Sequence, residues 1–296
     1  MSDNLFDLLA TRIRDPEAVA IETQAGERIR YGDLIARSGR MANALAGLGV
    51  QPGDRVAAQV EKSVQAIILY LATLRAGAVF LPLNTGYTPA EIGYFLGDAE
   101  PRVFVCDPSR QEALREPADA AGARMVTLDA EGRGSLTDAA EVAPAAFATA
   151  ARDSDDLAAL LYTSGTTGRS KGAMLTHGNL VSNALVLCDA WRFTAQDVLI
   201  HALPIFHTHG LFVATNVVLF SGASMIFLPK FDPDRVLGAM SRASVLMGVP
   251  TFYVRLLQEP ALDAAATANM RLFVSGSAPL LAETHREWQV RTGHAI

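Results

Sequence analysis

The stretch Leu157-Ala-Ala-Leu-Leu-Tyr-Thr-Ser-Gly-Thr-Thr-Gly-Arg-Ser-Lys-Gly172 decides the fold of this 296-residue chain. It begins with an uninterrupted apolar run, Leu157–Tyr162, which predicts a buried strand, and it continues into a loop rich in glycine and hydroxyl groups. Strands that are apolar on both faces are typical of parallel sheets covered by helices. Ligands bind to such sheets at the carboxyl ends of the strands. The stretch therefore predicts an α/β protein with a ligand-binding loop at the end of a buried strand.

The loop after this strand has the chemistry of a polyphosphate-binding site. Its hydroxyl groups come from Thr163, Ser164, Thr166, Thr167 and Ser170, and its glycines are Gly165, Gly168 and Gly172. The glycines let the backbone turn sharply and approach a ligand closely, and Arg169 and Lys171 add positive charge. Hydroxyl groups, free backbone N–H groups and cations together predict binding of phosphate oxygens. A Walker A loop is excluded because no Gly-Lys pair is followed by Ser or Thr, and an ordinary polar turn is the alternative.

Strand and helix patterns alternate along most of the chain. Apolar runs predict strands such as Val103–Cys106 and Val245–Val249. Helical spacing predicts helices such as Asp33–Leu48, with Asp33 as the N-cap, and Thr208–Phe220. The fold class is therefore α/β, with parallel-rich β-sheets flanked by helices.

One segment without a clear strand or helix pattern interrupts this alternation at residues 129–154, which are rich in Ala, Gly, Asp and Glu. Such a composition predicts either a surface excursion or a boundary between subdomains. We expect a first α/β subdomain over 1–155 and a second one over 156–296, which carries the Gly-rich loop.

Composition and charge exclude several classes of protein. Half of the residues are hydrophobic, which is ample for a buried core, and the formal net charge is −6. A nucleic acid or an anionic membrane surface requires a basic face, so neither is expected as a partner. Cys106 and Cys188 lack the spacing of metal ligands and predict two thiols in a reducing, cytoplasmic environment. The longest apolar stretch, Leu211–Pro229, is interrupted by polar residues and Gly222, which predicts buried core and not a membrane span.

The segment Tyr162–Gly172 resembles the signature loop of the adenylate-forming superfamily, which includes acyl-CoA synthetases, luciferases and peptide-synthetase adenylation domains. Three further segments resemble parts of that superfamily in the same order: Leu203–Gly210, Met247–Arg255 and Val274–Leu280. The resemblance covers essentially the whole chain. It implies the large N-terminal domain of this fold, with αβαβα-like layering and an acyl pocket in the second subdomain. It also implies that ATP activates a carboxylate to an acyl-AMP, and that CoA then accepts the acyl group.

The resemblance implies roles for particular residues. Catalysis is expected from Thr163, Lys171 and His207, with Thr163 as a minor ligand of Mg²⁺. The residues expected to bind ATP are Thr163, Ser164, Gly165, Thr166, Thr167, Gly168, Lys171, Gly276, Ser277, Ala278 and Pro279. The acid is expected to contact His207, Arg255 and Ser277, whereas His209 is expected to be structural. The alternatives are a satisfied core histidine for His207 and a simple turn hydroxyl for Ser277.

Arg255 bears on the identity of the acid, because it lies a turn into the helix that begins at Pro250. A guanidinium at the acyl pocket can pair bidentately with a second carboxylate, whereas a fatty-acid pocket does not favour a buried charge. The alternative is a surface arginine on an amphipathic helix, and Arg286 is a second, weaker candidate cation. With the segments His201–Pro204 and Leu228–Pro233, the pattern resembles bacterial malonyl-CoA synthetases. This resemblance implies malonate as the acid, with methylmalonate as a further candidate.

The resemblance also implies segments that are not among these 296 residues. They are a Tyr-Gly-Met/Leu-Thr-Glu motif that contacts the phosphates and Mg²⁺, a ribose-binding Asp, and a small C-terminal domain with a catalytic Lys. We therefore expect an N-terminal fragment that does not turn over by itself. Two alternatives stay open. One is a CoA ligase for an aromatic or aliphatic acid, and the other is a non-catalytic nucleotide-binding module.

Overall fold

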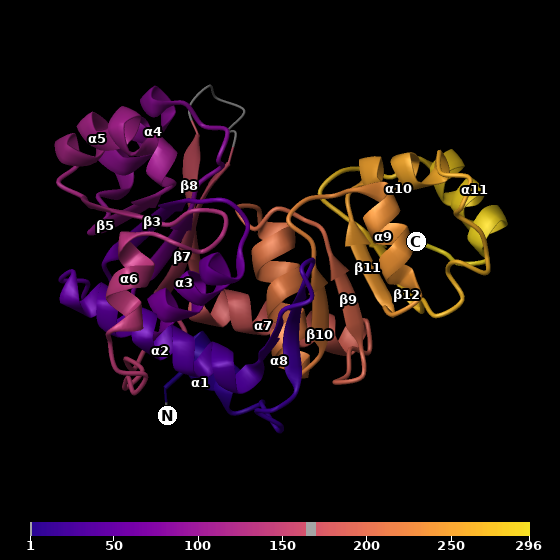
Figure 1. Ribbon diagram of the computed structural model, residues 1–296, viewed down its shortest axis with the longest axis horizontal. Coiled ribbons are helices and arrows are strands. Elements are labelled where there is room, and N and C mark those ends of the chain that lie inside the picture. The colour runs from indigo at the N-terminus through magenta and orange to yellow at the C-terminus, as the bar shows by residue number, and fades with distance from the viewer. Residues whose placement is uncertain (1, 164–169) are drawn as a thin grey trace. The chain divides into compact units, whose positions relative to one another are not determined.

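The computed structural model describes residues 2–163 and 170–296, and Figure 1 shows their helices and strands. The chain divides into two compact units, which are described one at a time. The first unit comprises Met1–Thr11 and Gly32–Asn183, and the second comprises Arg12–Tyr31 and Ala184–Ile296.

The first unit contains a six-stranded sheet in the order β6-β5-β3-β4-β7-β8. Its strands are β3 (Arg55–Gln59), β4 (Val79–Pro82), β5 (Val103–Cys106), β6 (Arg124–Thr127), β7 (Leu157–Thr163) and β8 (Lys171–Thr176). All neighbouring pairs are parallel except β7 and β8, which form an antiparallel hairpin. The predicted loop therefore follows the carboxyl end of a strand in a parallel sheet, as expected.

Helices of the first unit cover this sheet. They are α1 (Leu5–Ala10), α2 (Tyr31–Gly47), α3 (Val64–Arg75), α4 (Pro89–Ala99), α5 (Gln111–Ala120) and α6 (Ser135–Glu141), with a 3₁₀ turn η1 (Pro108–Arg110) before α5. On one face, apolar residues of α4 and α5 such as Phe95 and Leu114 join strand residues such as Phe104 in a single core cluster. Figure 1 shows α4 and α5 side by side over this part of the sheet. Burial of large apolar side chains in this cluster is the main force that holds α4 in place.

The second unit contains the other six-stranded sheet, in the order β12-β11-β9-β10-β1-β2. Its strands are β1 (Val19–Thr23), β2 (Arg28–Arg30), β9 (Val198–His201), β10 (Ser224–Phe227), β11 (Val245–Gly248) and β12 (Leu272–Ser275). Strands β1, β10, β9, β11 and β12 run parallel, and β2 is antiparallel to β1. All five parallel strands therefore end at one edge of the sheet, where the segments after β1, β9, β10, β11 and β12 begin.

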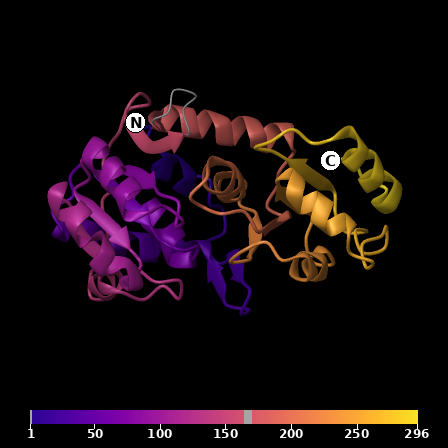
Figure 2. The same cartoon turned by 90° about the horizontal axis from the view of Figure 1, so that it is seen from above.

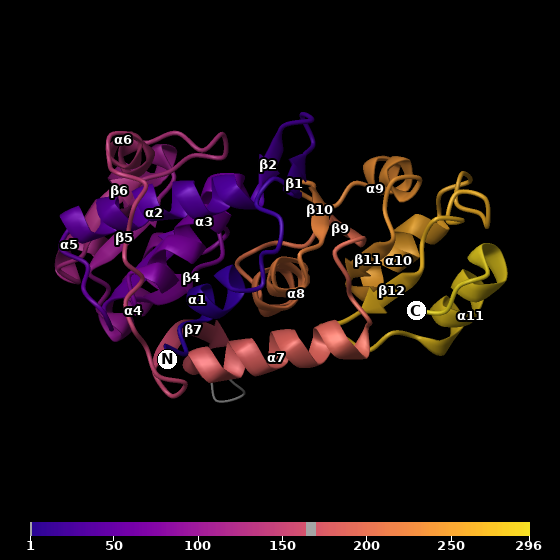
Figure 3. The same ribbon diagram turned by 90° about the horizontal axis from the view of Figure 1, so that it is seen from below.

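The helical elements of the second unit are η2 (His209–Thr215, a π-helix), α8 (Asn216–Ser221), α9 (Pro233–Met240), α10 (Pro250–Leu257) and α11 (Ala282–Thr292). Buried Met240, Tyr253 and Trp288 of α9, α10 and α11 share one core cluster with Leu246 and Phe273 of the sheet. Figures 1 and 3 both show α9 and α10 beside β11. The remaining helix, α7 (His177–Ala190), is continuous in Figure 2, and it begins in the first unit and ends in the second.

The predicted class, α/β with parallel-rich sheets flanked by helices, is confirmed. The predicted αβαβα-like layering concerns the arrangement of the two units and stays a prediction. Two local predictions were wrong. Asp33 lies in the first turn of α2, which begins at Tyr31, so it is not the N-cap. The predicted helix Thr208–Phe220 is divided into η2 and α8.

The two units differ from the predicted subdomains 1–155 and 156–296. β7 pairs with β4 through Phe80 and Ala159, so the strand before the loop belongs to the first sheet. The segment 129–154 contains α6 and packs within the first unit. Asn43 Nδ2 donates to the carbonyls of Pro144 and Ala146, at 2.8 and 2.9 Å, which satisfies backbone groups that would otherwise need water. This segment is therefore part of the first unit and not a boundary.

No helix in the described residues is both long enough and apolar enough to cross a lipid bilayer.

Candidate functional site

Two facing strand residues flank the predicted phosphate loop, and we call this pair the neck of the loop. Thr163 is the last residue of β7 and Lys171 is the first of β8, and the two are cross-strand partners. Both are exposed, so the hydroxyl and the ammonium are available to a ligand at the mouth of the hairpin. The predicted ATP-binding residues between them, Ser164, Gly165, Thr166, Thr167 and Gly168, lie outside the described residues.

In the second unit, three further predicted segments follow the carboxyl ends of neighbouring parallel strands. His207 and His209 follow β9, Arg255 follows β11, and Gly276 and Ser277 follow β12 directly. We call this side of the sheet the carboxyl edge. Since β9, β11 and β12 are adjacent, the topology gathers these side chains at one edge, where α/β proteins bind ligands.

His209 contacts the segment after β12, although it was expected to be only structural. Its Nδ1 lies 3.3 Å from the Ser277 hydroxyl, within hydrogen-bonding distance. A Cβ added at Gly276 would lie 2.9 Å from Cε1 of the same ring, so only glycine fits there without a shift of the histidine. Ser277 itself has a φ of 68°, a left-handed conformation that is uncommon for a residue with a side chain. His209 therefore packs against a strained backbone segment that is expected to bind ATP and the acid.

His207 differs from its neighbour because its side chain is exposed. Its ring lies 4.6 Å from the ring of Phe206 in an edge-on arrangement. Partial desolvation by the surrounding chain lowers its pKa, and burial lowers the pKa of His209 in the same direction. Both rings are therefore neutral at pH 7, and each can donate one hydrogen bond and accept another.

Arg255 lies in the last turn of α10, and its side chain is supported by an aromatic pair. Its guanidinium lies over the ring of Phe231, 4.8 Å from the centroid. Phe231 in turn stacks on Phe252, with ring centroids 3.9 Å apart and an interplanar angle of 20°. Such cation–π contacts orient an arginine and leave its N–H groups available. In the part of the chain that the structure describes, no carboxylate forms an ion pair with Arg255.

The structure thus joins some of the predicted site residues and separates others. His209, Gly276 and Ser277 are in contact, whereas no hydrogen bond among the described residues connects Arg255 with His207 or Ser277. Ala278 and Pro279 are exposed in the loop after β12. Two contacts were not predicted from the sequence, namely that of His209 with Ser277 and that of Arg255 with Phe231. The position of Phe231 after β10, at the same edge of the sheet, was the available signal.

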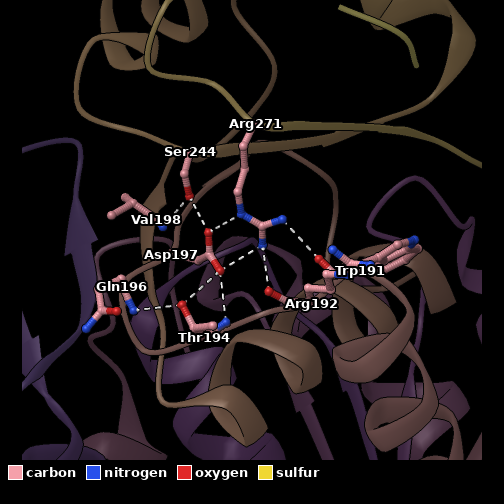
Figure 4. Close-up of polar contacts among 8 residues, drawn as sticks. All are labelled: Trp191, Arg192, Thr194, Gln196, Asp197, Val198, Ser244 and Arg271. Atoms are coloured by element: carbon pink, nitrogen blue, oxygen red, sulfur yellow. Dashed lines mark hydrogen bonds and ion pairs between the residues drawn. The ribbon is translucent and has the colours of Figure 1, made fainter.

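The opposite edge of this sheet, which we call the amino edge, holds a charged network (Figure 4). Asp197, Ser244 and Arg271 each immediately precede a strand, namely β9, β11 and β12. Arg271 donates from Nε and Nη2 to the Asp197 carboxylate, both at 2.7 Å, and Ser244 donates to it at the same distance. Arg271 also donates to the carbonyl oxygens of Trp191 and Arg192, after the end of α7. These groups satisfy one another, so this edge is suited to stability and not to ligand binding.

No group of three or more His, Cys, Asp or Glu side chains in the described residues is placed to hold a metal ion. The metal candidate from the sequence, Thr163, offers a single exposed hydroxyl. Mg²⁺ commonly keeps several waters and binds substrate phosphates, so one hydroxyl at a phosphate-binding loop is compatible with it.

A parallel α/β fold with a Gly-rich hydroxyl loop and polar residues at the carboxyl edge defines a class of nucleotide-binding enzymes. Residues 10–296 match the family described as AMP-binding enzyme, and the chain belongs to this family.

Among solved structures, apo MatB from Rhodopseudomonas palustris is 64% identical, with a TM-score of 0.98, over 100% of this chain and 59% of that chain. A feruloyl-CoA synthase from Amycolatopsis sp. is 34% identical over 90% of this chain and 53% of its own length. A malonate–CoA ligase from Arabidopsis thaliana is 29% identical over 89% of this chain and 47% of its own length. The chain therefore spans about half the length of the curated relatives that it matches.

Proposed function

We propose that this chain is the ATP- and acid-binding part of an AMP-forming acid–CoA ligase that acts on malonate, with methylmalonate as a second substrate. In this reaction a carboxylate oxygen of the acid attacks the α-phosphorus of ATP, and pyrophosphate leaves. The CoA thiol then attacks the acyl carbon of the acyl-adenylate, and AMP leaves. ATP, CoA and the acid are the small-molecule partners in this proposal.

The proposal is supported mainly by the environment of the Arg255 guanidinium. Its guanidinium is held over Phe231 at 4.8 Å, and no described carboxylate forms an ion pair with it. A cation that is oriented but not neutralised is suited to bind a carboxylate from outside the protein. An acid that carries a second carboxylate, such as malonate, satisfies this requirement, whereas a monocarboxylic acid has only the group that reacts.

The remaining candidate residues have roles that follow from their chemistry. Lys171 and Thr163 face each other at the neck of the loop, where an ammonium and a hydroxyl can bind phosphate oxygens. Negative charge develops on the α-phosphate and on pyrophosphate during adenylation, so fixed donors at this place lower the barrier. Neutral His207 and the Ser277 hydroxyl can donate hydrogen bonds to the acid or to the nucleotide. Mg²⁺, held in part by Thr163, would supply further neutralisation of phosphate charge when it is bound.

Similarity to known proteins supports the proposal. The chain is 64% identical to MatB from Rhodopseudomonas palustris over its whole length, and malonate–CoA ligases are among its relatives. The segments Pro250–Arg255 and Ser275–Leu280 are among those on which the predicted resemblance to bacterial malonyl-CoA synthetases rests. Cytoplasmic location belongs to the same proposal and follows from the two cysteines that are predicted to stay reduced.

A second candidate is a CoA ligase for an aromatic acid. The stacked Phe231–Phe252 pair offers an aromatic surface at the carboxyl edge, and a feruloyl-CoA synthase is among the relatives. In that case Arg255 would be a surface cation that packs on this pair.

Acid-dependent exchange of pyrophosphate into ATP distinguishes these candidates, measured with the full natural protein that contains residues 1–296. We expect malonate to support exchange most strongly, methylmalonate less strongly, and coumarate or a fatty acid weakly. Coumarate as the best substrate would establish the second candidate. ATP binding without exchange for any acid would indicate a non-catalytic nucleotide-binding module.

A further inference from the structure

Helix α4 contacts both ends of the phosphate loop. The Tyr162 hydroxyl, before the loop, donates a hydrogen bond of 2.5 Å to the Asp98 carboxylate. The Tyr94 hydroxyl donates one of 2.9 Å to the backbone carbonyl of Ser170, near the end of the loop. Tyr94 and Asp98 are four residues apart in α4 and therefore lie on one face of the helix.

Aromatic packing reinforces these two hydrogen bonds. The Tyr162 ring lies 4.5 Å from the ring of Phe95, and Tyr94 lies 6.4 Å from Tyr162. Tyr87 extends the cluster through its contact with Phe95 at 4.9 Å. A tyrosine anchored by its ring and by its hydroxyl has little freedom to change rotamer.

Helix α4 is itself firmly fixed. Its N-terminus has a capping box, in which Thr88 accepts from the Glu91 N–H and the Glu91 carboxylate accepts from the Thr88 N–H. Its apolar face, which includes Ile92 and Leu96, is fully buried in the core of the first unit. The helix can therefore serve as a rigid support for a loop whose own sequence is rich in glycine.

We propose that α4 is a positioning element of the ATP site, in which Asp98 and Tyr94 fix the entry and the exit of the phosphate loop. The inference rests on the proposed function, because it assigns ATP to that loop. Both contacts use groups that a phosphate does not need: the Tyr162 hydroxyl at the start of the loop and the Ser170 backbone carbonyl near its end. The hydroxyls of Thr163 and Ser170 and the ammonium of Lys171 stay available for the ligand.

The protonation state of Tyr162 is consistent with this role. Burial, the hydrogen bond to Asp98 and the charge of that carboxylate all raise the pKa of Tyr162. The hydroxyl therefore stays protonated at neutral pH, where it can donate to Asp98.

The test combines ATP binding with amide hydrogen exchange of residues 162–172, in the full natural protein that contains residues 1–296. Asp98→Ala and Tyr162→Phe each remove one partner of the same hydrogen bond, and we expect each to raise the Kd for ATP about fivefold. The double variant should match the single variants, because the two residues act through one contact. Tyr94→Phe should raise the Kd about threefold. Asp98→Asn keeps an acceptor oxygen and should restore most of the affinity.

Tyr87→Phe is the matched control, because it removes a hydroxyl from the same aromatic cluster. Among the residues described, that hydroxyl makes no hydrogen bond with a loop residue, so ATP affinity should be unchanged. Faster amide exchange at 162–172 in Asp98→Ala and Tyr94→Phe, with thermal midpoints equal to that of Tyr87→Phe, would support positioning. Unchanged exchange and unchanged affinity in both variants would overturn it. If the unaltered chain bound no ATP, the proposed function would fail, and the exchange rates would still decide whether α4 fixes the loop.

Discussion

The two edges of the second sheet are built from the same strands and have opposite character. At the amino edge, the Asp197 side chain is 5% exposed, and Arg271 and Ser244 saturate its carboxylate. At the carboxyl edge, His207, Arg255 and Ser277 are exposed, and Ser277 adopts a left-handed backbone conformation. Charge is neutralised inside the protein at one edge and left available at the other.

This difference shows where the sheet gains its stability and where it carries its function. A buried carboxylate with several donors holds the starts of three strands in register and is costly to disturb. A guanidinium stacked on an aromatic ring is oriented without being neutralised. Variants at the amino edge should therefore change folding stability, and variants at the carboxyl edge should change ligand binding.

The largest effect is expected from Asp197→Ala, which leaves Arg271 and Ser244 without their shared acceptor. We expect a loss of about 2–3 kcal/mol in the free energy of unfolding, less than for a fully buried pair because Arg271 is partly exposed. Urea denaturation measures this loss. Arg115→Gln breaks the exposed pair with Glu112 and should change the stability by less than about 0.5 kcal/mol. Equal effects of the two variants would contradict the assigned role of the amino edge.

At the carboxyl edge, Gly276→Ala should impair ligand binding more than folding. The added Cβ would lie 2.9 Å from the His209 ring, which must then move away from Ser277. We expect kcat/KM for the acid to fall about tenfold, which corresponds to about 1.4 kcal/mol. Steady-state kinetics of the full natural protein and urea denaturation give the two quantities. A large loss of stability with unchanged kcat/KM would show that this contact is structural.

The pH dependence of stability should differ between a titratable group at the carboxyl edge, His209, and one at the amino edge, Asp197. Burial lowers the pKa of His209 below 6.5, so stability falls as the pH decreases from about 6.5, where the unfolded chain binds the additional proton. Burial would raise the pKa of Asp197, but hydrogen bonds from Arg271, Ser244 and the Thr194 N–H lower it overall. Its contribution is present above about pH 3.8 and is lost as the pH falls below that value.

His209→Asn should therefore reduce the pH dependence of stability below about pH 6.5, and Asp197→Asn should reduce it only below about pH 3.8. Each group accounts for at most about 1.4 kcal/mol per pH unit. His177 of the first unit, whose pKa burial lowers to about 4, contributes equally in both variants. Guanidinium denaturation at a series of pH values provides the slopes. Identical profiles of stability against pH for the two variants would mean that protonation of His209 and of Asp197 does not affect stability in separate pH ranges.

The smallest effect is expected from Gly238→Ala in α9. A Cβ at this position meets no atom within 4 Å, and alanine is the better helix former. We expect a gain of about 0.5–1 kcal/mol in the free energy of unfolding, with unchanged acid selectivity. Thermal unfolding checks the gain, and a loss of stability would mean that the helix needs the flexibility of glycine.

Local signals predicted much of this fold. The buried strand before the loop, the strand Val103–Cys106 and the helix after Pro250 all follow from apolar patterns and helix-start residues. Pairing between distant strands was not predictable in the same way. β1 joins β10 more than 200 residues later, and β7 joins β4, because burial of the whole sheet decides these partners. The predicted subdomain boundary failed to reproduce the units for this reason.

The parts of the candidate site that are contiguous in the sequence could be predicted from their motifs. The contacts between residues distant in the sequence could not. The phosphate loop and the residues after β9, β11 and β12 were located from sequence, but their proposed roles stay predictions. The contact of His209 with Ser277 joins residues 68 positions apart. Likewise, the bond from Arg271 to Asp197 spans 74 positions. The sequence around a single charged residue does not indicate which distant residue it pairs with, so such contacts can be identified only from the structure.

The proposed preference for malonate depends on selection of a dicarboxylic acid by Arg255. The measurement that tests it most directly is acid-dependent ATP–pyrophosphate exchange with malonate and with coumarate, comparing the natural protein with Arg255→Ala and the control Arg286→Ala. We expect Arg255→Ala to lower kcat/KM for malonate about 100-fold, since a charge-assisted pair is lost, and to leave coumarate nearly unchanged. Arg286→Ala should leave both values unaltered. Intact malonate selectivity in Arg255→Ala would show that Arg255 does not select the acid.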